Sequence, residues 1–333
     1  MTSLLASIKA ALLGPDSGAA TTAQNASAAT GAQSESAMSA ASSASPASAS
    51  AAAANGRRHS PSTVEELELE LLLEAIFQCH GYDYRGYQRE LVARHVRATM
   101  RRLDTPTISA LQASVLHDAE AWDVLHRALY VDPALMFDDA SEVTLLRMSL
   151  GACLHGAALP RIWLADCAGA QQAWTLAILL DQEQLIARTE IYATLASDSL
   201  LAEARQASLP MARMTELQAF YVRSGGIGQL LDYFDVSADG TRAVLAPRLS
   251  ERITWAQYNL VTDASFNEFH MILGQRALPA FGMALRQRVL RLFDDSLAPF
   301  GVLALDRELE PTDRVGSHYR ALASHLPWYQ RRA

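Results

Sequence analysis

The sequence is poor in several residue types, and each absence limits what the protein can do. Lys9 is the only lysine among 28 basic residues, so arginine carries nearly all of the positive charge. The three cysteines, Cys79, Cys153 and Cys167, form neither a CxxC pair nor the spacing of metal ligands. Neither a disulfide framework nor a zinc site is expected, and a reducing, cytoplasmic location is predicted.

Long apolar runs and excess positive charge are also missing. No apolar run reaches the roughly 18 residues that a membrane span requires, which predicts no membrane insertion. The formal net charge is −8. An acidic protein is a poor candidate for nucleic-acid binding, because phosphate recognition relies on basic surfaces. The histidines are not paired with acids at ligand spacing, so no metal site is expected. The oligomeric state is left open.

The first 60 residues differ in composition from the rest of the chain. Between Asp16 and Arg57 the only charged residue is Glu35, and Ala, Ser, Thr, Gly, Asn and Gln dominate. Such a segment cannot bury enough apolar surface to offset the entropy of ordering its chain. We therefore expect residues 1–60 to be a disordered Ala/Ser-rich tail.

Helical patterns begin directly after this tail. A Ser or Thr followed three residues later by Glu, within 60–66, predicts a helix start, and Gly81 predicts its end. Further helices are predicted over about 86–103, 108–117 and 120–129. Residues 61–145 are therefore expected to form a small all-helical domain.

After Pro160 short apolar strands alternate with helices. The strands are predicted at 161–165, 190–194, 253–257, 269–273 and 301–305. Helices are predicted over 173–185 and 197–206, and an amphipathic helix precedes the last strand. This alternation is typical of βαβ units with a mainly parallel sheet, whose ligand crevice lies at the carboxyl ends of the strands. Residues 146–333 are therefore expected to form an α/β domain.

Several segments resemble a known family. Gly81–Tyr87, with the arginine-rich helix after it, is similar to the N-terminal domain of CheR-type chemotaxis receptor methyltransferases. Tyr258–Phe269 resembles the family's NLVTDxSFNEF stretch nearly letter for letter, and Arg223–Tyr233 is similar to its GGxGSLxDYY segment. The resemblance covers about residues 64–333. It implies a helical substrate-recognition domain joined to a Rossmann-like domain, which transfers methyl from S-adenosylmethionine to receptor glutamates.

The cofactor loop departs from the family's pattern. The stretch W-S-A-G-C-A-T-G-E-E corresponds to Trp163–Gln172 here, with Asp166 and Ala170 in place of glycines. Glycines in such a loop let the backbone approach the ligand. Gln171 and Gln172 replace paired glutamates. Their amides still form hydrogen bonds but no longer attract the cationic groups of the cofactor.

Other positions that the resemblance assigns to chemistry are also changed. Leu195 replaces an aspartate that accepts hydrogen bonds from the ribose, and Arg276 replaces an asparagine. Asp138 stands in place of an arginine beside the substrate carboxylate, and Ala280 in place of a tyrosine beside the transferred methyl. Repulsion between Asp138 and an anionic substrate glutamate about 4 Å away would cost roughly 1–4 kcal/mol, depending on screening. The resemblance therefore leaves no catalytic residue.

The cofactor-binding candidates that remain are Asn259, Leu260 and Gln171. We therefore expect a degenerate, non-catalytic homologue in chemotaxis or signal transduction, which has a degraded S-adenosylmethionine site and acts as a regulatory or scaffolding protein. If the protein is active its cofactor is S-adenosylmethionine; if it is inactive it needs none. The alternative is a divergent S-adenosylmethionine-dependent protein-glutamate O-methyltransferase, with a remodelled site, that still acts on receptor glutamates.

The partner implied by the resemblance is a chemoreceptor or another signalling protein. The candidate partner surface consists of basic residues on and before the second helix, namely Arg85, Arg89, Arg94, Arg97 and Arg101. In an otherwise acidic protein these arginines would attract acidic partners. The alternative is a solvated charged helix face.

Overall fold

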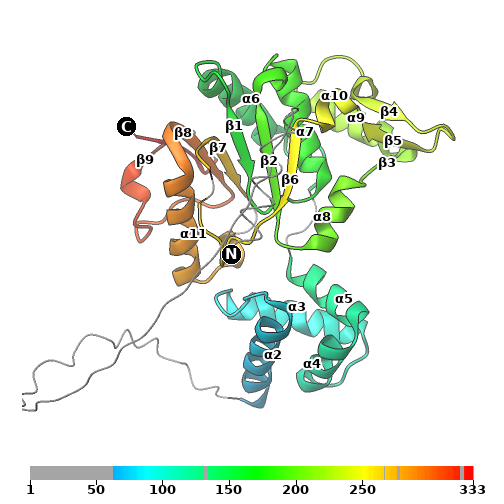
Figure 1. Ribbon diagram of the computed structural model, residues 1–333, viewed down its shortest axis with the longest axis vertical. Helices are drawn as coiled ribbons and strands as arrows, with labels where there is room; N and C mark the ends of the chain where they lie inside the picture. Colours follow the sequence, from blue (N-terminus) through cyan, green and yellow to red (C-terminus); the bar gives the residue numbers. More distant parts are fainter. Residues whose placement is uncertain (1–62, 131–133, 266, 276–277, 323–325, 333) are drawn as a thin grey trace, which may run out of the picture. The chain divides into compact units, whose positions relative to one another are not determined.

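The computed structural model describes residues 63–130, 134–265, 267–275, 278–322 and 326–332 (Figure 1). The expected tail, residues 1–60, lies outside the described residues. Arg276 does as well.

Four helices form the first described part of the chain. They are α2 (Val64–His80), α3 (Arg89–Arg102), α4 (Ile108–His117) and α5 (Ala119–Leu129). Thr63 and Glu66 form a capping box, because the side chain of each accepts a hydrogen bond from the backbone N–H of the other. Gly81 ends α2 in the left-handed conformation, with φ of 77°. The predicted all-helical N-terminal domain is confirmed.

A mainly parallel sheet of seven strands follows. In spatial order the strands are β6 (Ile253–Gln257), β2 (Glu190–Leu195), β1 (Arg161–Leu164), β7 (Phe269–Gly274), β8 (Leu297–Leu305), β10 (Trp328–Arg331) and β9 (Tyr319–Ala321). Neighbours from β6 to β8 are parallel, and β10 is antiparallel to both β8 and β9. This confirms the predicted Rossmann-like sheet.

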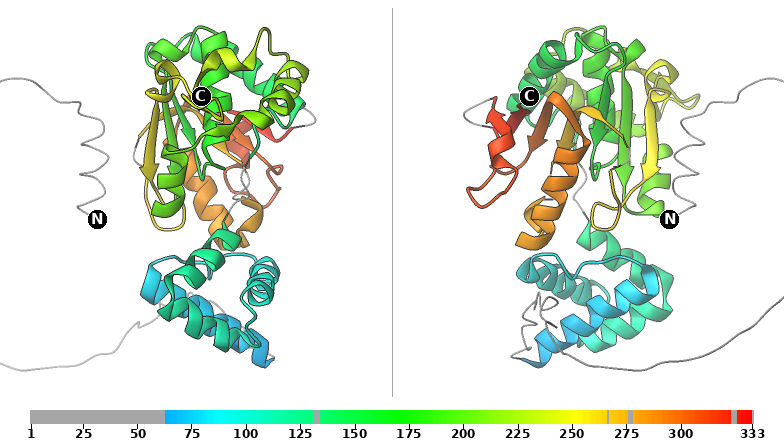
Figure 2. Two further views of the ribbon diagram at one scale, coloured as in Figure 1. Left: turned by 90° about the vertical axis from the view of Figure 1, so that its right-hand side faces the viewer. Right: turned by 60° about the vertical axis from the view of Figure 1, so that its left-hand side comes forward.

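Helices cover both faces of the sheet (Figures 1 and 2). The helices after α5 are α6 (Ala140–Leu154), α7 (Ala170–Gln182), α8 (Asp198–Arg205), α9 (Met214–Arg223), α10 (Pro247–Ser250) and α11 (Met283–Ser296). Strand β1 shows the two faces, because Ile162 and Leu164 belong to the core with α6 and α7, whereas Trp163 belongs to the core with α11. A small antiparallel sheet, β3 (Leu209–Pro210), β5 (Arg242–Leu245) and β4 (Phe234–Val236), lies between α8 and β6 in the chain and was not predicted.

Helix α6 crosses the expected domain boundary after residue 145. Asp139 caps this helix by accepting hydrogen bonds from the backbone N–H groups of Ser141 and Glu142. Its buried side chains, among them Val143 and Leu150, belong to the core of the large sheet. Because α6 packs with the sheet, we propose that the boundary between the domains lies before α6.

Residues 86–88 join the helical segment to the loop after β7. The Gln88 N–H donates to the Ala280 carbonyl oxygen at 2.7 Å. Tyr87 forms an isolated antiparallel bridge with Phe281, and their rings meet edge to face with centroids 5.0 Å apart. Helix α3 therefore begins three residues later than the sequence predicts, because these residues pair with another segment of the chain.

A buried ion pair fixes the segment after β8 to α11. Arg286 Nη2 donates to Asp313 Oδ2 at 2.7 Å, and the two side chains are 7% and 1% exposed. Burial acts to raise the pKa of Asp313, but the hydrogen bonds from Arg286 and from the Glu310 N–H outweigh it and hold this pKa below its ordinary value. Arg286 also donates to the Glu308 carbonyl oxygen at 3.0 Å.

Replacing Asp313 with alanine should strongly destabilise the fold. The Arg286 guanidinium would stay buried without its counter-ion, which costs about 3–5 kcal/mol in the free energy of unfolding. Glu216→Ala is the control, because its partner Arg213 is 35% exposed and such pairs contribute about 1 kcal/mol or less. Urea unfolding measures both changes, and equal losses would contradict this account of the buried pair.

Candidate functional site

The connectivity of the sheet places a crevice beside the end of β1. Strand β1 is parallel to β2 on one side and to β7 on the other, and the chain passes to β2 before it returns to β7 (Figure 1). The strand order therefore reverses at β1. Ligands of open α/β sheets bind at such a reversal, outside the carboxyl ends of the strands. The loops after β1, β2, β6 and β7 all reach this edge.

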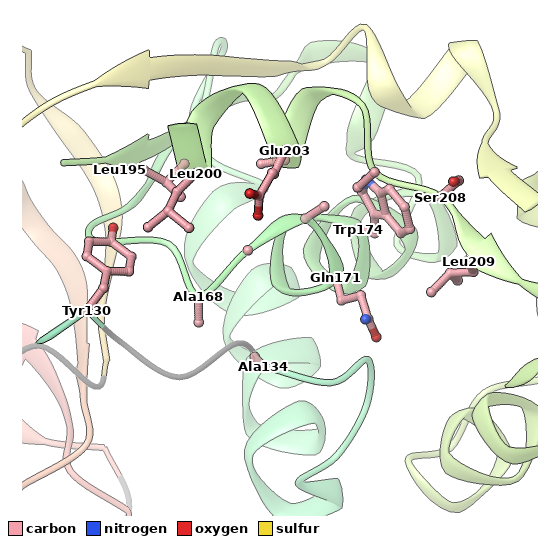
Figure 3. A pocket seen from close by; sticks show the side chains of 14 residues that line it. Tyr130, Ala134, Ala168, Gln171, Trp174, Leu195, Leu200, Glu203, Ser208 and Leu209 are labelled. Carbon is pink, nitrogen blue, oxygen red and sulfur yellow. The ribbon is translucent and has the colours of Figure 1, made fainter. Parts of the chain in front are cut away.

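A cavity of about 300 Å³ opens between the loop after β1, the end of β2 and helix α8 (Figure 3). Leu195 and Leu200 lie next to each other on one wall, and Trp174 forms another. Among the described residues that line the cavity, Glu203 alone carries a carboxylate, which Figure 3 shows directed toward the loop of Ala168. The other polar side chains of the wall are Tyr130, Gln171 and Ser208, and the remaining lining residues are apolar.

The Glu203 carboxylate is already held by an arginine. Arg127 Nη1 donates to one of its oxygens at 2.9 Å, and Nη2 donates to the other. Arg127 Nε also donates to Asp123 at 2.6 Å. The hydrogen bonds to Glu203 and Asp123 raise the pKa of Arg127, so the pair stays charged. The charge of the one carboxylate in the cavity wall is thus balanced.

The two glutamines of the cofactor loop connect loops to one another. Gln171 lines the cavity, and its side-chain oxygen accepts from the Met136 N–H at 3.2 Å. Gln172 accepts from the Ala168 N–H at 2.8 Å and donates to Gln275 at 3.3 Å. The amide oxygens of both glutamines are therefore engaged within the protein.

Asn259 and Leu260 lie in the turn after β6. The Asn259 side-chain oxygen accepts from the Val261 N–H at 2.9 Å, and the Asn259 N–H donates to Asp263 at 2.9 Å. Leu260 is buried. Of the three predicted cofactor-binding residues, Gln171 lines the described cavity and these two do not. Their role in cofactor binding stays a prediction.

Asp138 and Ala280 lie apart from this cavity. Asp138 lines a smaller cavity with Glu142, Gln172 and Gln275, beside the start of α6. Ala280 lies where the helical segment meets the loop after β7, and its carbonyl oxygen accepts the Gln88 N–H. The structure does not bring either residue to the cavity near Leu195.

Sequence reasoning noted Asp166 only as a lost glycine, but the structure makes it the most unusual residue of the crevice. It has φ of 49°, a conformation that glycine, asparagine and aspartate adopt most readily. Its side chain is buried, and its Oδ1 atom has no hydrogen-bond partner. Burial raises the pKa of Asp166 to about 7, although the nearby Tyr130 hydroxyl partly opposes this rise.

Aromatic side chains from the helical segment surround this region. Tyr84 and Tyr87 come from the chain between α2 and α3, and Tyr130 follows α5. The Tyr84 side chain is buried, whereas Tyr87 and Tyr130 are half-buried. Desolvation of the hydroxyl group raises the pKa of each, and the charge of Asp166 raises it further. Tyr84 OH lies 2.7 Å from His126 Nδ1. Burial lowers the pKa of His126 to about 4, so this imidazole is neutral at pH 7. The sequence signal that could have revealed this aromatic environment is the tyrosine-rich stretch after α2.

Comparison with known protein families identifies the chain. Residues 140–308 match the SAM-binding domain of CheR methyltransferases, and residues 67–130 match the all-alpha domain of the same enzymes. The chain belongs to the CheR methyltransferase family. The predicted resemblance is confirmed.

Individual relatives agree with this assignment. The chain is 32% identical over 240 residues to Cher3 of Pseudomonas putida, named as a methyltransferase, and the match covers 72% of this chain and 87% of Cher3. It is 28% identical over 167 residues to chemotaxis protein methyltransferase 1 of Pseudomonas aeruginosa, covering 48% and 58% of the two chains. A solved O-methyltransferase family protein of Burkholderia thailandensis is 14% identical, with TM-score 0.34 and coverage of 68% and 55%, a likeness too low to carry an argument.

The residues of this CheR-family chain fit S-adenosylmethionine unequally. Leu195 offers no acceptor to the ribose hydroxyls, and the carboxylate of Glu203 is paired with Arg127. Asp166 is not among the residues that line either described cavity, and the Tyr130 hydroxyl already acts on its carboxyl group. The described residues contain no group of three His, Cys, Asp or Glu that could hold a metal ion, and no described helix is long and apolar enough to cross a membrane.

The raised pKa of Asp166 predicts a pH-dependent stability. The ordinary value is 3.8 and the folded value about 7, so the folded state holds the proton more tightly than the unfolded state. The stability due to the neutral acid is complete below about pH 4 and is lost as pH rises to about 7. Asp166→Asn stays neutral and tolerates the positive φ. Its melting temperature relative to the wild type should therefore increase from pH 5 to pH 7 and then level off.

Asp198→Asn, at an exposed position at the start of α8, is the control for the loss of one carboxylate. If the difference in melting temperature between the wild type and Asp166→Asn stays constant across this pH range, the account of a buried ionisable carboxylate is contradicted.

Proposed function

We propose that this CheR-family protein does not transfer methyl groups to glutamate, and that it acts as a regulatory or scaffolding protein in chemotaxis or related signalling. The observation that carries the proposal is the environment of Ala280. The resemblance implies a tyrosine beside the transferred methyl at this position. Here the residue contributes a backbone carbonyl that accepts the Gln88 N–H at 2.7 Å, and its side chain has no group that could contact a reacting atom.

Two further positions support this proposal. Asp138 cannot supply the forked guanidinium donors that bind a substrate carboxylate. Leu195 presents an alkyl side chain to the cavity, where a ribose would need an acceptor. Each lost hydrogen bond to a charged group costs about 1–3 kcal/mol. Cofactor affinity should therefore be at least about tenfold weaker than in a family enzyme that keeps these groups.

The second candidate function is a divergent methyltransferase with a remodelled site. The cavity beside Leu195 favours it, since this cavity could still hold the family's cofactor. The two candidate functions differ in one measurable property, which is whether the protein catalyses methyl transfer.

Incubation with methyl-labelled S-adenosylmethionine and a chemoreceptor fragment that contains methylatable glutamates tests the proposal. We expect no label on the receptor, because the groups that would orient the carboxylate and contact the methyl are absent. Leu195→Asp should not restore transfer, since several contacts are missing together. A CheR-family enzyme that retains the arginine and tyrosine is the positive control. Receptor labelling by the wild-type chain would establish the divergent methyltransferase instead.

The arginines of the proposed partner surface divide into two groups. Arg85 pairs with Glu74 at 2.7 Å, and Arg89 pairs with Glu70 at 2.6 Å. A further pair links Arg97 and Glu65 at 2.6 Å. These contacts tie the arginines to the acidic face of α2, so a purely structural role accounts for them.

Arg94 and Arg101 differ from these three. Both are exposed on α3, and neither forms an ion pair with a described residue. We propose that they lead the contact with an acidic chemoreceptor or other signalling partner. The related Pseudomonas aeruginosa protein carries a chemotaxis name, which supports this class of partner.

Reversing Arg94 and Arg101 together to Glu should abolish capture of a chemoreceptor signalling fragment, while the circular dichroism spectrum stays unchanged. Capture by the wild type should also weaken with salt, because the Debye length falls from about 10 Å at 0.1 M to about 3 Å at 1 M. The control reverses two exposed arginines elsewhere, Arg252 and Arg291, which changes the net charge equally. If both double variants bind as the wild type does, α3 presents only a solvated face.

A further inference from the structure

We propose that an apolar stripe on α2 forms the second half of a partner surface with the exposed arginines of α3, and that the two halves together fit one amphipathic helix with an acidic flank. The stripe consists of Val64, Leu67 and Leu71. The proposal rests on the contact proposed for Arg94 and Arg101. It adds an apolar half to that contact, and with it the form that the partner must present.

The outer face of α2 carries apolar side chains where a surface helix normally carries polar ones. Val64 is 76% exposed, Leu67 44% and Leu71 51%. Their spacing of three and four residues places them on one face of α2. No other described helix exposes more than one large apolar side chain. The stripe therefore indicates an interaction site more strongly than a single exposed leucine does.

The side chains of the stripe are not part of the core of the helical segment. α2 contributes a different set of residues to that core, each 3% exposed or less, and this set is Leu69, Leu72, Leu73 and Ile76. At 3.6 residues per turn, the core set and the stripe lie on opposite faces of the helix. α2 is thus apolar on two faces, and packing within the helical segment accounts for only one of them.

Ion pairs between α2 and α3 show how the two helices lie. Glu65, in the first turn of α2, pairs with Arg97, and Glu70, further along α2, pairs with Arg89. The position of the arginine falls as the position of the glutamate rises, so the helices run antiparallel and side by side. By the same progression, Arg94 lies level with the middle of the stripe. The stripe and the exposed arginines of α3 are therefore neighbouring bands of one surface, with a row of ion pairs between them.

The charges on the two sides of the stripe are of opposite sign. On the α3 side the glutamates are paired with arginines, and beyond them Arg94 and Arg101 are exposed without an ion pair to a described residue. On the α4 side Glu68 accepts a hydrogen bond from the Ser109 hydroxyl and likewise forms no ion pair with a described residue. Because opposite charges attract and like charges repel, the acidic flank of a bound helix faces α3.

The spacing of the stripe selects the form of the partner. Apolar side chains at positions i, i+3 and i+7 span about 10 Å along α2, which is about two helical turns. A second helix laid alongside covers such a stripe with apolar side chains at the same spacing. Apolar contacts in the middle and charged contacts at the edge are the usual arrangement of a protein interface. The partner is therefore a helix with an apolar stripe beside a row of acids.

Calorimetric titration of the full chain with a chemoreceptor signalling fragment, repeated at several salt concentrations, tests the two halves separately. Leu67→Ser with Leu71→Ser should weaken binding by about tenfold or more at every salt concentration, because two apolar side chains no longer leave water on binding. Binding by this variant should still weaken as salt rises, since its arginines are intact. Arg94→Gln with Arg101→Gln should weaken binding at low salt and make the dependence on salt shallower.

Met148→Ser with Met283→Ser is the matched control. It also removes two exposed apolar side chains, but from α6 and α11, and should change the affinity by no more than about twofold. Circular dichroism and thermal melting check that each variant is folded. Sedimentation of the wild type and of Leu67→Ser with Leu71→Ser, without the fragment, checks whether the stripe joins two copies of the chain.

Several results would overturn the proposal. If the leucine variant binds as tightly as the wild type while the arginine variant binds less tightly, the stripe takes no part and the contact proposed for α3 stands alone. If neither variant changes the affinity, or the wild type does not bind the fragment, the contact proposed for α3 fails as well. A wild type that self-associates, beside a leucine variant that stays monomeric, would assign the stripe to a second copy of the chain.

Discussion

The parallel pairing of β1 with both β2 and β7 determines where every candidate residue of this protein lies. Because the strand order reverses at β1, the loops after β1, β2, β6 and β7 open to the same edge of the sheet. Asp166 and Leu195 are at this edge for topological reasons, whatever their chemistry. A chain with this arrangement keeps a crevice at this edge whichever side chains line it.

The replacements at this edge follow a pattern. Acceptors and donors that the family resemblance implies have become an alkyl group at Leu195, a methyl at Ala280 and neutral amides in the cofactor loop. Meanwhile one new carboxylate, Asp166, has been buried among tyrosines. A buried carboxylate without a counter-ion costs stability, and strain or cost of this kind is commonly retained where it serves binding. The site therefore combines replaced side chains with one buried acid.

Much of the fold could be predicted from sequence, because local signals determine it. The capping box at Thr63, the stop at Gly81 and the apolar strands of the parallel sheet all follow from short patterns. The small antiparallel sheet and strands β9 and β10 were not predicted, since short strands with mixed polarity are fixed by distant partners. The same reason applies to the site: Asp166 is buried in the fold, and the side chain that acts on it, Tyr130, lies 36 positions before it in the chain. Sequence alone shows the substitution of a glycine but not the enclosure of the acid.

The most direct test of this account is a carbon-13 NMR titration of the Asp166 side-chain carboxyl, with Asp166→Asn to assign the signal. In the free protein the account predicts a pKa near 7, because the folded chain encloses the acid without a counter-ion. An ordinary pKa near 4 in the free protein would contradict it.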